Sequence, residues 1–273
     1  MELEKIWTIS LSPTGNTERT VRLLAETLAD RLGCPVEHRG FTTPVERAAE
    51  QVFRAGELVV IGTPTYAGRL PNKLAPELRQ RLRSSGALAV AVVTFGNRSY
   101  DNALAELCAL LTGNGFQAVA AGAFVAQHAM TDALGYGRPG WSDQFELKQF
   151  ADRIAGKVRG LAGTPEPLSV PGDPDAAYYI PRGTDGQPVD FLKAKPKTDG
   201  KRCNGCGACA RRCPMGAIDP KEVSRVPGTC IKCQRCVVKC TRGAKYFDDP
   251  ALLDHVAMLA RDFADPKENE VFL

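Results

Sequence analysis

The chain has 273 residues, of which 44% are hydrophobic and 24% are charged, and its formal net charge is +4. This composition excludes the disordered and low-complexity classes, and the length suits one large domain or two small ones. Cysteine is the exception to the ordinary composition, because eight of the ten cysteines lie between Cys203 and Cys240.

Targeting signals are missing from the sequence pattern. Segment 1–17 has neither the basic region nor the apolar stretch of a signal peptide, and the longest apolar runs, 87–93 and 118–125, are shorter than the ~18 residues of a membrane span. We therefore expect a cytoplasmic protein without a membrane partner. Thiols stay reduced in that compartment, so clustered cysteines there favour metal binding or catalysis over disulfides.

Positive charge gathers around the cysteines. Residues 193–245 hold 14 basic and three acidic side chains, a net charge of +11, whereas residues 246–273 carry −5. A basic stretch of this kind is also typical of nucleic-acid binding. Here it is interleaved with eight thiols whose thiolates, and any cluster that they hold, would offset much of the charge, so we expect no nucleic-acid partner.

The first 160 residues alternate strand-like and helix-like segments. The expected strands are 6–11, 35–39, 58–62, 87–94 and 116–125, several of them short runs rich in Val and Ile that are typical of buried parallel strands. The expected helices are 17–32, 72–83, 100–111 and 142–161. This alternation predicts right-handed βαβ units and a five-stranded doubly wound sheet, which is an α/β fold.

The rest of the chain divides into three parts. Residues 163–200 contain five Gly and seven Pro, and we expect a connector with one or two short strands packed on a neighbouring domain. The cysteines follow, and residues 250–263 predict a C-terminal helix. The predicted domains are therefore 1–162, 163–200, 201–248 and 249–273.

The cysteines form an internal repeat. Each member of the first run, Cys203, Cys206, Cys209 and Cys213, recurs 27 positions later in the second run as Cys230, Cys233, Cys236 and Cys240. The spacing C-x₂-C-x₂-C-x₃-C holds 4Fe–4S clusters in bacterial ferredoxins. Zinc is the alternative for paired CxxC motifs, although four ligands per ion leave the third and fourth Cys of each run unexplained.

Both runs closely resemble those of the two-cluster ferredoxins, which are small α+β domains. That resemblance implies one cluster on Cys203, Cys206, Cys209 and Cys240, and a second on Cys230, Cys233, Cys236 and Cys213. The second run departs from the family pattern, because Thr241 stands where Pro214 follows the first run. The two remaining cysteines, Cys34 and Cys108, are expected to be inert packing residues.

The first expected strand ends in Ser12-Pro13-Thr14-Gly15-Asn16-Thr17 and passes directly into a helix. Hydroxyls and backbone N–H groups at a helix N-terminus form a cradle for phosphate. A plain capped helix, with Asn16 or Thr17 as the N-cap, is the alternative.

Two more loops follow expected strands, 62–71 and 94–101. Ligands of open α/β sheets bind beyond the carboxyl ends of the strands, and the strand order 2-1-3-4-5 brings these loops to the phosphate cradle. Together the three loops resemble those of flavodoxin over residues 1–162. The resemblance implies FMN bound by Ser12, Thr14, Gly15, Asn16, Thr17, Pro64, Thr65, Tyr66, Ala67, Gly68, Thr94, Phe95, Gly96, Asn97, Tyr100 and Asp101. Tyr66 and Phe95 could equally be aromatic residues that pack the loops.

Two features outside these loops carry weaker signals. Residues 135–140 fit the dinucleotide fingerprint G-x-G-x-x-G, but the motif lies well beyond its strand and opens no helix directly, so we expect a turn. His128 follows the fifth strand at the ligand-facing edge. Contact with the flavin or with the ferredoxin module is the alternative there, but we expect a hydrogen-bonded structural histidine. The roles of His128 and Arg138 stay open.

The order of the two parts resembles the flavodoxin–ferredoxin fusion proteins of anaerobes. That resemblance implies a low-potential electron-transfer protein that couples FMN to two 4Fe–4S clusters and delivers electrons to a redox partner docked near the basic ferredoxin domain. One alternative is an NAD(P)H-dependent flavin or quinone reductase, although the chain shows no nicotinamide-binding motif. The other is an iron–sulfur redox sensor. A homodimer remains open.

Overall fold

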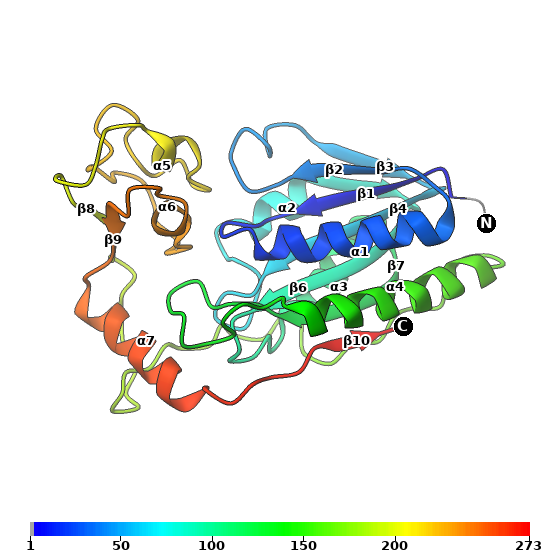
Figure 1. Ribbon diagram of the computed structural model, residues 1–273. Helices are drawn as coiled ribbons and strands as arrows, with labels where there is room; N and C mark the ends of the chain where they lie inside the picture. The colour runs from blue at the N-terminus through cyan, green and yellow to red at the C-terminus, as the bar shows by residue number, and fades with distance from the viewer. Residues whose placement is uncertain (1–2) are drawn as a thin grey trace.

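A computed structural model describes residues 3–273 and shows a sheet layered between helices (Figure 1). Six strands lie in the order β10-β7-β6-β4-β1-β2. Their bounds are Lys5–Ser10 for β1, Val36–Gly40 for β2, Glu57–Pro64 for β4, Leu88–Phe95 for β6, Gln117–Val125 for β7 and Glu270–Phe272 for β10. Within this sheet, β2, β1, β4, β6 and β7 are all parallel. This arrangement confirms the predicted α/β fold and its strand order.

Four helices cover the two faces of this sheet. One face packs against α1 (Asn16–Leu32) and α4 (Trp141–Gly160), and the other packs mainly against α3 (Ala103–Gly113) and α2 (Ala75–Arg81). The central strand β6 is buried along its whole length, as its apolar run predicts. Helix α1 approaches β4 closely because Gly62 has no side chain, and a Cβ there would lie 2.3 Å from Val21 Cγ2.

A small second sheet was not predicted. Strand β3 (Gln51–Arg54) pairs in parallel with β5 (Leu82–Ser85). Helix α2 is therefore shorter than the predicted 72–83, because β5 begins directly after its last residue. Both strands are only four residues long, and Phe53 is buried while its neighbours are exposed, so the alternation is too brief to stand out in the sequence.

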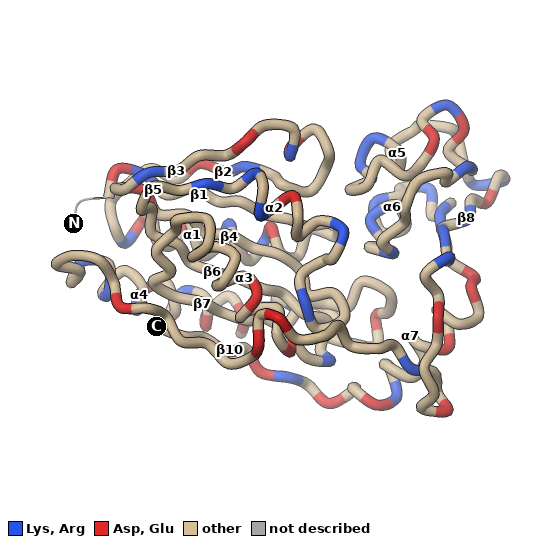
Figure 2. Tube along the Cα trace, turned by 180° about the vertical axis from the view of Figure 1, so that it is seen from behind, with Lys and Arg blue, Asp and Glu red and all other residues tan. Residues whose placement is uncertain are grey.

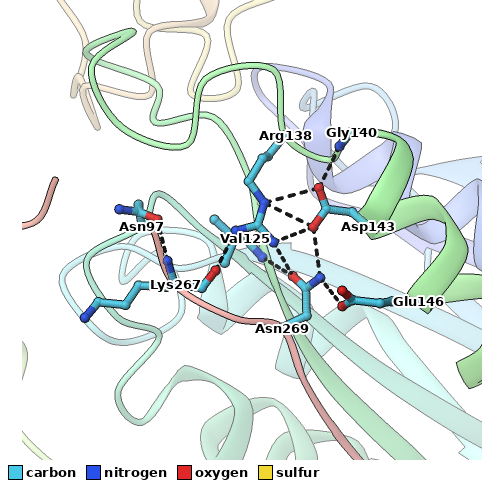
Figure 3. Close-up of polar contacts among 8 residues, drawn as sticks. All are labelled: Asn97, Val125, Arg138, Gly140, Asp143, Glu146, Lys267 and Asn269. Carbon is cyan, nitrogen blue, oxygen red and sulfur yellow. Dashed lines mark hydrogen bonds and ion pairs between the residues drawn. The ribbon is translucent and has the colours of Figure 1, made fainter. Parts of the chain in front are cut away.

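The C-terminal tail adds an antiparallel edge strand, β10, to β7. Figure 3 shows how turn 135–140 holds the tail: Arg138 pairs with Asp143, and Asn269 donates to Asp143 at 2.9 Å and accepts from the Val125 N–H at 2.9 Å. Helix α4 begins directly after the turn, so the expectation that the motif opens no helix was wrong. The segment nevertheless anchors the chain's own tail and does not line the cavity described below.

The cysteine-rich module lies beyond the carboxyl ends of the parallel strands (Figure 1). It contains β8 (Lys197–Thr198), α5 (Ala208–Arg211), α6 (Arg235–Val238) and β9 (Lys245–Tyr246), and β8 and β9 are antiparallel. Helix α7 (Pro250–Asp262) follows and leads into the tail. Figure 2 shows Lys and Arg distributed around α5, α6 and β8, whereas acidic residues predominate in the tail.

The connector packs on the sheet domain. The Tyr179 N–H donates to the Ala67 carbonyl at 2.9 Å, and the Tyr178 hydroxyl donates to the Leu70 carbonyl at 2.8 Å. Apart from β8, its extended structure within residues 163–200 is a single bridge between Arg182 and Pro188. The predicted domain boundaries stay predictions, with α4 ending before 162 and α7 beginning after 248.

Candidate functional site

A large cavity opens where β1, β4 and β6 end. Its volume is about 1080 Å³, close to the upper end of the range for ligand pockets. Loops of the sheet domain form one wall, and the connector and segment 227–233 of the cysteine-rich module form the other. The residues predicted to bind FMN that line it are Thr14, Asn16, Thr17, Pro64, Thr65, Tyr66, Ala67, Gly68, Thr94, Phe95 and Gly96.

The loop before α1 has the properties of an anion cradle. Gly15 takes φ +106°, a conformation that favours glycine, and turns the chain into the helix. Within residues 3–273 the backbone N–H groups of Asn16 and Thr17 have no protein acceptor. Ser12 Oγ instead accepts from the Glu18 N–H at 2.9 Å. Two donors at the positive end of α1 therefore remain for an anion, which fits a phosphate group.

Threonine hydroxyls shape the middle of the cavity. Thr17 Oγ1 and Thr94 Oγ1 are hydrogen-bonded at 2.7 Å, and this contact ties the start of α1 to the end of β6. Thr65 Oγ1 is buried and has no partner among the described residues. A buried hydroxyl without a partner is costly. Because Thr65 lines the cavity, a polar group of a bound ligand would give this hydroxyl a partner.

Two aromatic side chains lie on the cavity wall. Phe95 is almost fully buried and packs against Tyr100, with ring centroids 5.5 Å apart. Burial raises the pKa of Tyr66 well above its usual value, and the nearby Cys233 and Cys230 sulfurs add to the shift. Tyr66 therefore stands between the sheet domain and the second cysteine run, with its hydroxyl protonated at neutral pH.

The other residues predicted to bind FMN do not line the cavity: Ser12, Gly15, Asn97, Tyr100 and Asp101. The Asn97 amide donates to the Phe263 carbonyl at 2.7 Å and so holds the segment after α7. The Tyr100 hydroxyl donates to the Glu270 carboxylate at 2.8 Å, and Asp101 pairs with Arg98. These residues support the wall, and their predicted contact with FMN stays a prediction.

Histidines occupy the far side of the cavity. His128 packs over Gly96, where an added Cβ would lie 2.3 Å from its ring. Its Nδ1 accepts from the Met130 N–H at 3.2 Å, and burial lowers the pKa of His128 to about 4. His255 was not predicted as a wall residue. Its Nδ1 hydrogen-bonds to the Arg182 carbonyl at 2.8 Å, and it lies on an amphipathic helix with no motif to mark it.

The two cysteine runs adopt the same backbone path. Positive φ angles occur at matched positions 27 residues apart, at Gly205 and Lys232 (70° and 53°) and at Gly207 and Gln234 (71° and 60°). Helices α5 and α6 are matched in the same way. Because non-glycine residues rarely take positive φ, the fold itself imposes this loop on the second run. The repeat inferred from the sequence is therefore a structural repeat.

Backbone N–H groups point at cysteine sulfurs in matched places. The Ala217 N–H lies 3.3 Å from Cys213 Sγ, and the Ala244 N–H lies 3.3 Å from Cys240 Sγ. Burial raises the pKa of Cys240, but several backbone N–H groups outweigh it, and its pKa falls below the usual value. Such donors stabilise thiolate ligands and tune the cluster that they hold.

The second run is the more buried of the two. Burial raises the pKa of Cys233 and of Cys236 to about 12, whereas Cys206 in the first run is exposed. Bound iron would deprotonate these thiols, so cluster assembly releases protons. Within residues 3–273, no three Cys, His, Asp or Glu side chains converge on a single-ion site. The division of the cysteines between two clusters stays a prediction.

A comparison with family models identifies part of the cysteine-rich module. The family model of the 4Fe–4S binding domain, Fer4, matches residues 196–219. This match and the strand order of the sheet decide the architecture. The chain is a fusion of a flavodoxin-like domain and a 4Fe–4S ferredoxin module. In the described part of this fusion, no helix is long and apolar enough to cross a membrane.

Solved structures resemble the flavodoxin-like domain of the fusion. A flavodoxin from the domain Archaea is 17% identical, with 57% of this chain and 99% of that chain covered and a TM-score of 0.37. The Megasphaera elsdenii flavodoxin is 15% identical, with 55% and 98% covered and a TM-score of 0.34. An NADH:FMN oxidoreductase is 16% identical, with 59% and 93% covered and a TM-score of 0.40. The search of curated proteins found no match.

Proposed function

We propose that this fusion is a low-potential electron-transfer protein that couples FMN to two 4Fe–4S clusters and delivers electrons to a redox partner. The observation that carries the proposal is the shared cavity. Cys230 and Cys233 of the second run line the same cavity as Thr14 of the phosphate loop and Tyr66. Bound FMN exchanges electrons in pairs or singly, whereas a 4Fe–4S cluster exchanges one at a time.

The chain's own residues supply the binding and the exclusion of water. The N–H groups of Asn16 and Thr17 would bind the phosphate, and the Thr65 hydroxyl would meet the polar edge of the ring. Tyr66 and Phe95 line the cavity and would supply its apolar contacts to a bound ring. The connector covers the cavity from the side, because Tyr178 and Tyr179 are hydrogen-bonded to the loop that carries Tyr66.

The first cysteine run suits an external partner. Cys206 is exposed, and so are the neighbouring Lys201, Arg202, Arg211 and Arg212. Exposed positive charge steers an acidic protein surface and aligns it before contact. We therefore place the docking site of an acidic redox partner at the first run, with the second run turned towards the flavin cavity.

Anaerobic purification with measurement of flavin, iron and sulfide tests the proposal. The expected result is one FMN per chain and about eight iron atoms, as two 4Fe–4S clusters require. NADH and NADPH should leave the flavin absorbance unchanged, and a low-potential chemical donor should bleach both chromophores. Prompt bleaching by either nucleotide would make the protein a pyridine-nucleotide reductase. Zinc in place of iron, or no flavin, would refute the proposal outright.

A further inference from the structure

The ferredoxin module touches the flavodoxin-like domain at the back of the phosphate loop. Arg235, the first residue of α6, donates through Nη1 to the carbonyls of Ser12 at 2.9 Å and Pro13 at 2.7 Å. Its Nε is buried and has no partner among the described residues. A charged side chain from the second cysteine run thus holds two consecutive carbonyls of the loop whose N–H groups face the cavity.

A second contact leads to the same loop. Pro214, the residue after Cys213, accepts from buried Arg47 Nη2 at 2.8 Å, and Arg47 Nη1 donates to the Thr42 carbonyl at 2.6 Å. Thr42 Oγ1 in turn accepts from the Ser12 N–H at 2.8 Å. Both the amide and the carbonyl of Ser12 are therefore held by groups that connect to the ferredoxin module.

Lys239, one turn beyond Arg235, adds an unpaired charge. Its Nζ lies 3.4 Å from the point where a Cβ on Gly15 would stand, and within residues 3–273 Lys239 forms no ion pair. An ammonium group beside the loop raises the positive potential where a phosphate dianion would bind.

The internal repeat shows that the ferredoxin fold does not require Arg235. Its counterpart 27 residues earlier is Ala208, and the two short helices nevertheless have the same length and matched hydrogen bonds. Lys239 has a basic counterpart, Arg212, and both side chains are exposed. The arginine is therefore specific to the run that faces the phosphate loop.

We propose that Arg235 and Lys239 make the ferredoxin module part of the phosphate site, so that the chain selects a phosphorylated flavin over riboflavin only when the second run is folded. This inference rests on the proposed function, because it takes FMN as the ligand. Arg235 is a positioning residue that fixes the loop through its carbonyls, and Lys239 contributes charge. Linkage requires that loss of the second cluster weakens FMN binding and that bound FMN stabilises the second cluster by the same free energy.

Anaerobic fluorescence titration of the flavin-free, cluster-loaded protein with FMN and with riboflavin tests this inference. Arg235→Ala should raise the Kd of FMN by about ten-fold or more, as expected for lost charge-assisted hydrogen bonds, with far less effect on riboflavin. Lys239→Ala should raise it by about two- to five-fold, an effect that salt screens. Arg235→Lys keeps the charge and should fall between the native protein and Arg235→Ala.

Arg212→Ala is the matched control and should leave both affinities unchanged. Iron content and cluster absorbance show whether each variant has kept its clusters, and removal of iron by a chelator tests the linkage without any substitution. If neither Arg235→Ala nor iron removal changes the ratio of FMN to riboflavin affinity, this inference is overturned, whereas the proposed function stands. If the native protein binds neither flavin, the proposed function fails as well.

Discussion

The network that anchors the C-terminal tail gives the most quantitative prediction. Arg138 is 22% exposed and its partner Asp143 only 4%. The guanidinium Nε lies 3.1 and 3.2 Å from the two carboxylate oxygens. Breaking a buried pair costs about 3–5 kcal/mol. Asp143 keeps the Gly140 N–H at 2.6 Å and the Asn269 amide at 2.9 Å, so we expect Arg138→Met to destabilise the flavodoxin-like domain by about 2–3 kcal/mol at pH 7.

The same contacts determine how the destabilisation by Arg138→Met depends on pH. Burial raises the pKa of Asp143, but hydrogen bonds from Arg138, Asn269 and Gly140 outweigh it and hold its pKa below 3.8. This carboxylate therefore stabilises the fold above pH 3.8, and the stabilisation is lost as the pH falls through the lower folded-state value. Without Arg138, Asp143 loses the largest of the contributions that lower its pKa, so its pKa rises. The difference in stability between the native and variant proteins should therefore shrink as the pH falls below 3.8.

Denaturant unfolding of the cluster-loaded protein under anaerobic conditions measures this effect, with the fluorescence of buried Trp7 reporting on the sheet domain. Arg153→Met is the control, since Arg153 is exposed on α4, the helix that carries Asp143, and forms no ion pair within residues 3–273. A difference below about 0.5 kcal/mol at pH 7, or one that does not shrink as the pH falls below 3.8, would refute the reasoning.

Three further predictions follow from buried contacts. Glu106→Gln should destabilise the domain by about 3 kcal/mol in the same unfolding assay, because buried Arg69 donates to this carboxylate at 2.7 Å and would lose its charged partner; an unchanged midpoint would contradict this. Gly96→Ala should weaken flavin binding in a fluorescence titration, since the new methyl group would meet the His128 ring; native affinity would show that the ring moves freely. In the cluster-loaded protein iodoacetamide should modify Cys34 much faster than Cys108, because Cys108 is buried and burial raises its pKa to about 12. Mass spectrometry of timed samples measures both rates, and equal rates would contradict this prediction.

The sheet was predictable because its strands are buried on both faces. Continuous apolar runs such as 87–94 are typical of buried parallel strands, and Pro and Gly residues mark the turns between them. The edge strand β10 was not predictable, because residues 270–272 are a short segment whose pairing depends on Asn269 and Arg138, far apart in the sequence. Tertiary contacts of this kind have no local signal.

The site was predictable where backbone geometry needs particular residues. The loop with Gly15 and the cysteine spacing follow from local chemistry, and the structure brings both to one cavity. The roles of Asn97 and Tyr100 were not visible, since a side chain after a strand can face the ligand or the protein equally well. His255, Arg235 and Arg47 escaped notice because their contacts join distant segments and carry no motif.

Flash reduction of the bound flavin under anaerobic conditions, followed by the absorbance of the clusters, tests the central claim most directly. If the flavin shares its cavity with Cys230 and Cys233, cluster reduction should follow as a first-order process whose rate does not change with protein concentration. Cys233→Ser, which alters the predicted ligand set of the second run, should slow or abolish that phase. A rate proportional to protein concentration, or clusters that stay oxidised while the flavin is reduced, would contradict the account.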